Sequence, residues 1–165
     1  TTQVTGYQRR ERRSRKILSH EQLELEPQRL ITRAFWYTIE HRLCEDIGVV
    51  TSQLPGALHA AEHAMIGMLP LFTICDRWDV GGVSTAMHQD TLHPSIFIYD
   101  GYPGGTGIAE LGYQVAGRHL RATLDLLHAC GCKDGCPSCV VSPKCGNGNE
   151  PLDKAGAIAL LTLAP

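Results

Sequence analysis

A cysteine-rich stretch, residues 130–146, constrains this chain more than any other feature and reads CGCKDGCPSCVVSPKCG. Five of the chain's seven cysteines lie in it, separated by glycine and proline residues that favour sharp bends. Four thiolates brought to one point form the tetrahedral sulfur site in which zinc is bound at about 2.3 Å. We therefore predict a structural zinc site in this loop, with zinc as the cofactor.

The spacing favours one set of four ligands, in the pattern Cys-x3-Cys-x2-Cys-x5-Cys: Cys132, Cys136, Cys139 and Cys145. Gly131 is expected to end a long helix, which would place Cys130 on the last helical turn and leave it to packing. Cys130 remains an alternative to Cys132. A site with four sulfur ligands leaves no position for water, so no catalytic residue is predicted at this metal.

Disulfides and redox chemistry are the competing explanations for so many cysteines. An odd cysteine count without a secretory signal argues for a reducing compartment, so a cytoplasmic location without a disulfide framework is expected. A thioredoxin-like pair would need Cys136 and Cys139 at a strand-to-helix turn, and no strand is predicted before them.

Composition indicates a globular chain: 165 residues, of which 43% are hydrophobic and 19% charged. It has no apolar run of about eighteen residues, so no membrane partner is expected. The sequence lacks an initiator methionine and stops in an apolar run, which suggests one accessory domain, residues 1–165, excised from a larger protein.

The pattern of residues predicts an α+β fold. Residues 1–39 are rich in strand signals and are expected to form a small antiparallel sheet, with 30–39 as its best-buried strand. Residues 40–165 read as a helical half that carries the zinc loop, and the segments with the clearest patterns are helices at 57–68, 108–129 and 152–163 and a strand at 96–99. A glycine-rich loop, 101–107, precedes the 108–129 helix; it predicts tight packing of helix on strand, with a phosphate contact as the alternative.

A basic strip, RRERRSRK at residues 9–16, is the strongest charge feature in a chain of net charge −2. Such a strip predicts either a surface that contacts nucleic-acid phosphates or a solvated edge strand protected by charge. The candidate phosphate contacts are the cations of the strip and two lysines of the zinc loop: Arg9, Arg10, Arg12, Arg13, Arg15, Lys16, Lys133 and Lys144.

His59, Glu62 and His63 lie on one face of the predicted 57–68 helix in the order H-x-x-E-H, which is also found in inverted zinc peptidases. Histidines four residues apart can share a metal, with the glutamate as general base. The alternative is a pair of helix histidines hydrogen-bonded to nearby loops. A third ligand is not evident, and the candidates to complete such a site are Asp76, Asp79, Asp100 and Glu110.

Four segments in this order resemble the C-terminal zinc-binding domain of MrfA-type DEAD/DEAH-box DNA helicases: LPGALHAAEHA (54–64), CDRWDVGGVS (75–84), IFIYDGYPGGTGIAE (96–110) and the cysteine-rich run that begins at residue 132. The resemblance implies a parent protein of helicase superfamily 2 that binds and hydrolyses ATP, translocates 3′ to 5′ on single-stranded DNA and acts in DNA repair. It also implies zinc ligands at the four positions favoured by spacing. The chain lacks a phosphate-binding lysine loop and a D-E-x-H box, so the motor must lie outside it.

The resulting hypothesis is a zinc-stabilised accessory module that packs on the helicase motor domains of the same protein and helps to engage single-stranded DNA. Two other classes stay open: a metal-dependent hydrolase built on the H-x-x-E-H helix, and a protein-interaction module whose basic strip meets an acidic partner. The accessory module predicts one zinc ion per chain and the hydrolase predicts two metals.

Overall fold

A computed structural model describes residues 5–26 and 28–163, and the chain divides into two compact units, residues 1–30 and 31–165. The described part of the first unit is an antiparallel hairpin of β1 (Gly6–Arg10) and β2 (Ile17–Gln22). None of its described side chains is buried, so this unit has no apolar core of its own among the described residues.

A three-stranded antiparallel sheet forms the centre of the second unit, in the order β3-β5-β4. Its strands are β3 (Ala34–Thr38), β4 (Val80–Thr85) and β5 (Ser95–Asp100). The prediction that 30–39 is the best-buried strand is wrong, because β3 lies at an edge and buries only Phe35. The central strand is β5, where four of six residues are buried.

Helices cover one face of this sheet, as the strand register shows. Phe35 pairs with Ile98, and Ile98 pairs with Gly82, so these three residues share a face. On that face Phe35 lies against Gly112 of α3 (Ile108–Gln114), and Gly82 lies against Glu62 of α2 (Leu54–Met68). The opposite face carries Trp36 stacked on Phe97 at 5.8 Å between ring centroids, with Trp36 exposed. A sheet with one covered and one open face is typical of antiparallel strands.

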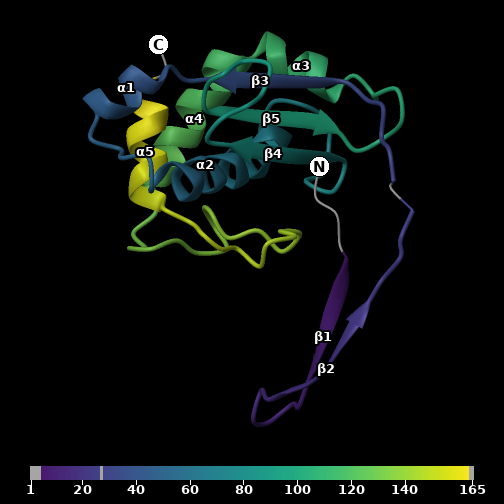
Figure 1. Cartoon of the computed structure of the whole chain (residues 1–165). Helices are drawn as coiled ribbons and strands as arrows, with labels where there is room; N and C mark the ends of the chain where they lie inside the picture. Colours follow the sequence, from purple (N-terminus) through teal and green to yellow (C-terminus); the bar gives the residue numbers. More distant parts are fainter. Residues whose placement is uncertain (1–4, 27, 164–165) are drawn as a thin grey trace. The chain divides into compact units, whose positions relative to one another are not determined.

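The helices of the described residues are α1 (His41–Asp46), α2 (Leu54–Met68), α3 (Ile108–Gln114), α4 (Ala116–Ala129) and α5 (Lys154–Thr162), with a short 3-10 turn η1 (Leu69–Leu71) after α2. The predicted 108–129 helix is interrupted at Val115, which caps both α3 and α4. Within the second unit, α2 lies between the sheet and α5 (Figure 1), and twelve of its fifteen residues are buried. These elements confirm the α+β class.

Helix α2 is thus the main scaffold on which the rest of the second unit packs. At its start, Gly56 and Ala57 lie so close to α5 that a Cβ added to Gly156 would come within 2.7 Å of the Ala57 methyl group. None of the helices among the described residues has the length and apolar character needed to cross a membrane.

Candidate metal centre

The cysteine-rich loop joins α4 to α5 and contains no helix or strand (Figure 1). Helix α4 ends at Ala129, and Cys130 follows it in an extended conformation, with φ −76° and ψ 112°. A tight turn then brings Cys136 and Cys139 together, closed by a 3.0 Å hydrogen bond from the Cys139 amide to the Cys136 carbonyl. The thiol of Cys130, after α4, and the thiols of the Cys136–Cys139 turn can therefore lie close to the same point.

Four sulfur atoms meet there, those of Cys130, Cys132, Cys136 and Cys139, all within 4.8 Å of one another. Four of their Sγ–Sγ separations are 3.5, 3.5, 3.4 and 3.7 Å. A tetrahedral zinc site with bonds of about 2.3 Å has sulfur–sulfur edges of about 3.8 Å. The four thiols are therefore spaced as zinc requires, and much too far apart for disulfides.

The structure differs from the predicted ligand set at one position, since Cys130 takes the place predicted for Cys145. The extended backbone at Cys130 turns its thiol back toward Cys132 instead of leaving it in the helix packing. After Cys139 the chain is drawn onto α2 by a hydrogen bond between the Val140 carbonyl and His63, and Cys145 lies against α2 instead.

At two of the four thiols, those of Cys132 and Cys136, hydrogen bonds favour the ionised form that a metal needs. Burial opposes ionisation of Cys132, but hydrogen bonds from the neighbouring thiols and from Lys154 lower its pKa to about 7. The pKa of Cys136 is also lowered, chiefly by the Ser138 backbone. Burial raises the pKa of the Cys139 thiol to about 12. A coordinated divalent cation deprotonates thiols outright, so zinc would complete the ionisation of this set.

Lys154, which the sequence analysis missed, supplies the positive charge beside this cluster. Its Nζ donates to the carbonyl oxygens of Cys130 and Cys132 at 2.6 and 2.8 Å, and to the Cys132 Sγ at 3.4 Å. Burial lowers the pKa of Lys154, but the hydrogen bond to Cys132 and the charge on the nearby thiolates outweigh this and raise it. A lysine at the start of a helix carries no sequence signal for this role.

A second cluster brings together His59, His63 and Cys145, whose ligand atoms also lie within 4.8 Å of one another. The His59 Nδ1 lies 2.9 Å from the Pro151 carbonyl, and the His63 Nδ1 lies 2.7 Å from the Val140 carbonyl. These are the loop contacts expected for helix histidines. Burial is the largest cause that lowers the pKa of His63, so its imidazole is held neutral.

Glu62 is buried next to this cluster but turned toward the sheet. Its Oε2 accepts a 2.6 Å hydrogen bond from the Ser84 hydroxyl of β4, and its Oε1 lies against Gly82. Burial raises the pKa of the Glu62 carboxyl, partly offset by Ser84 and His59. The structure therefore places His59, Glu62 and His63 on α2 as predicted, but gives Glu62 a partner in the sheet.

The carboxylates suggested as completing ligands lie outside both clusters of the described residues. Asp100 is fully buried and caps α3, accepting hydrogen bonds from the amides of Thr106, Gly107 and Ala109. The free amides of the glycine-rich loop are thus used by a side chain of the protein itself. This supports the packing interpretation of that loop over a phosphate contact.

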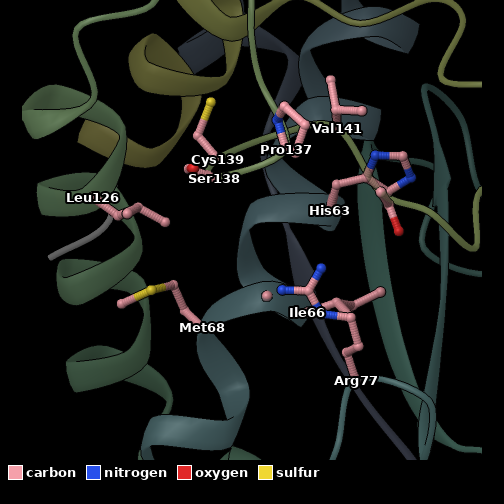
Figure 2. Close-up of a pocket in the computed structure, with 11 residues that line it drawn as sticks. His63, Ile66, Met68, Arg77, Leu126, Pro137, Ser138, Cys139 and Val141 are labelled. Carbon is pink, nitrogen blue, oxygen red and sulfur yellow. The ribbon is translucent and has the colours of Figure 1, made fainter.

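A cavity of about 110 Å³ borders on both clusters. Figure 2 shows Cys139 and Ser138 of the loop on one side of it, with His63, Ile66 and Arg77 on the other. Small molecules of the size of water can therefore lie near His63 and near Cys139.

The basic strip lies at the end of the hairpin in the first unit. Arg9 and Arg10 end β1, and the other four cations occupy the turn between β1 and β2. All six side chains are exposed. The strip thus runs from the end of β1 through the turn of the hairpin, with every cation exposed to solvent.

The two lysines of the zinc loop differ from each other. Lys133 is exposed. Lys144 is half-buried, and its Nζ donates to the backbone carbonyls of Arg77, at 2.7 Å, and Val80. Its ammonium is therefore engaged by backbone carbonyls within the second unit.

Comparison with known proteins gives a family match over the same region. The model of the MrfA Zn-binding domain matches residues 61–140. An uncharacterised protein of Methanocaldococcus jannaschii is 45% identical over an alignment of 107 residues, and the match covers 63% of this chain and 96% of that protein. The helicase YprA of Bacillus subtilis is 38% identical over 120 residues, 72% of this chain and 15% of YprA.

A solved structure, that of the DUF1998 helicase MrfA bound to DNA, has the same fold over most of the chain. The TM-score is 0.72 at 28% identity, and the match covers 96% of this chain and 20% of the MrfA chain. The chain therefore spans nearly all of the archaeal relative and only a small part of each helicase.

Proposed function

Because the chain belongs to the MrfA zinc-binding domain family, we propose that it is the zinc-stabilised module of an ATP-dependent DNA helicase. In this role it packs on the motor domains of the same protein and helps to engage single-stranded DNA. The helicase relative and the DNA-bound MrfA structure support this proposal. The resemblance to MrfA-type helicases extends it to 3′-to-5′ translocation and DNA repair.

The zinc of this module is held by Cys130, Cys132, Cys136 and Cys139, the set whose spacing fits a tetrahedral ion. With four sulfur ligands the ion has no position for water, so its contribution is structural. What these residues do is fix the path of the loop between α4 and α5. Lys154 orients the backbone around the ligands and offsets part of their negative charge.

The observation that carries the DNA-binding proposal is the exposed hairpin tip with six cations and one carboxylate in eight residues. Among the described residues no salt bridge involves these cations. Exposed arginines without an acidic partner, gathered on one hairpin, can contact several phosphates of one strand without reading its sequence.

Salt dependence of single-strand binding tests this proposal. Each lost phosphate contact lowers the slope of log affinity against log salt by about 0.7. We expect Arg12→Gln with Arg13→Gln to lower it by about 1.4 and to weaken binding to all sequences alike. The matched control is Arg42→Gln with Arg121→Gln, two exposed arginines of α1 and α4. Equal slopes for both double variants would leave the hairpin tip as a merely solvated turn.

A further inference from the structure

We propose a second metal site, formed by His59 and His63 of α2 with Cys145 of the loop, that binds a zinc ion separately from the four-cysteine cluster. The three side chains come from segments far apart in the sequence, yet their ligand atoms lie within 4.8 Å of one another. The His59 Nε2 is 3.4 Å from the Cys145 Sγ, and the two imidazole centroids are 4.3 Å apart.

The hydrogen bonds of the two histidines leave one nitrogen atom of each ring available to a metal. Each Nδ1 faces a backbone carbonyl, of Pro151 for His59 and of Val140 for His63. A carbonyl oxygen only accepts hydrogen bonds, so each Nδ1 must carry the proton, and the Nε2 of each neutral ring presents a lone pair. Metal-bound histidines are almost always oriented in this way by a second partner of the ring.

The distance between sulfur and nitrogen agrees with coordination. Zinc bound at about 2.05 Å to nitrogen and about 2.3 Å to sulfur places these ligands about 3.5 Å apart in a tetrahedron. A hydrogen bond from the thiol would also explain 3.4 Å for His59. However, the thiol has a single proton and can serve only one of two imidazole acceptors, whereas a cation serves both and the thiolate as well.

The site is suited to a metal ion that holds the loop on α2, rather than to a metal ion that catalyses hydrolysis. No fourth histidine, cysteine or carboxylate of the described residues joins the three ligands, so water or a small ligand would take the remaining position of zinc. Glu62 is bonded to Ser84 on the sheet and is not directed at such a water. The ion would hold the loop on α2 at Cys145, between the two carbonyl contacts at Val140 and Pro151.

Metal content of the full 165-residue chain tests the proposal. After zinc loading and removal of loose metal, we expect two zinc ions per chain in the wild type. Cys145→Ser and His63→Gln are each expected to retain one. The matched control is Cys75→Ser, which removes a thiol outside both clusters and should leave two. One zinc in the wild type, or two in Cys145→Ser, would overturn the proposal.

If a variant fails to fold, its metal content is not informative. Cobalt spectra of the wild-type protein then test the second site without any variant. Titration with Co²⁺ should show two successive spectra, one of a four-thiolate site and one of a site with nitrogen ligands and a single thiolate. A titration that ends after the four-thiolate spectrum would also contradict the second site. If only the four-thiolate spectrum were missing, the result would contradict the proposed structural zinc site and not the second metal site.

Discussion

At the residue scale, Lys154 determines how the charge of the zinc loop is balanced. Four thiolates and one Zn²⁺ carry a net negative charge, and a buried negative site needs compensation. Lys154 is itself only 6% exposed and lies against the backbone and sulfur of the ligands. Its ammonium satisfies two carbonyl oxygens that water would otherwise have to reach.

We expect Lys154→Met to weaken zinc binding about 10- to 100-fold, the usual effect of removing an outer partner of a metal site. The aliphatic part of the side chain is kept, so the change isolates the charge and the hydrogen bonds. Competition with a chromophoric chelator measures the zinc affinity. Arg121→Met, an exposed position on α4, is the control. Equal affinities for the two variants would show that Lys154 is not part of the metal centre.

The sequence predicted that the loop binds zinc, and its proposed ligand set contains three of the four cysteines whose thiols the structure brings together. It placed Cys145 where Cys130 lies, because spacing alone does not show which way a thiol turns at the end of a helix. Two features decide which thiols meet. One is the extended backbone of Cys130, and the other is the hydrogen bond between His63 and the Val140 carbonyl, which holds the chain after Cys139 on α2. Both depend on contacts between segments far apart in the sequence.

At the scale of elements, two helical glycines show where packing is tight and where it is open. A Cβ added to Gly112 of α3 would lie 2.6 Å from the Phe35 ring, which is much closer than side chains approach. A Cβ on Gly117 of α4 would meet nothing within 4 Å. Helix α3 therefore sits on the sheet through a glycine that no larger residue can replace without movement.

We expect Gly112→Ala to destabilise the protein by about 1–3 kcal/mol through overpacking against Phe35. Gly117→Ala should stabilise it by about 0.5–1 kcal/mol, because alanine loses less backbone entropy in a helix. The change in the free energy of unfolding caused by the same substitution thus has opposite signs at the two positions. Urea unfolding of the zinc-bound protein measures both changes. Two changes of the same sign would contradict the packing described for α3.

Elements with strong apolar periodicity were predicted well, whereas a strand with two adjacent glycines was not. The 57–68 helix and the 96–99 strand follow from apolar spacing and correspond to α2 and β5. Strand β4 was not among the predicted elements, because two adjacent glycines interrupt its apolar pattern. In the structure Gly81 makes room for the Tyr99 ring on one face, and Gly82 for Glu62 and Ile66 on the other. Glycine is needed in a strand where neighbours approach this closely, and sequence alone does not reveal that approach.

At the scale of the whole molecule, the second unit depends on metal where it lacks regular structure. The loop between α4 and α5 has no helix or strand to stabilise it, and Val140 is its main buried apolar contact. Binding of a structural metal then contributes directly to folding free energy, because the unfolded chain holds no preformed site. None of the described residues of the first unit belongs to either cluster of metal ligands.

Our central claim about this loop is that Cys130, and not Cys145, coordinates the zinc. Determining which of the two cysteines is a ligand tests that claim most directly. The measurement is the four-thiolate cobalt absorption of single serine variants at Cys130, Cys132, Cys136, Cys139 and Cys145. We expect it to be lost or strongly reduced in the first four variants and retained in Cys145→Ser. Retention in Cys130→Ser together with loss in Cys145→Ser would contradict the structure and restore the ligand set that spacing alone predicts.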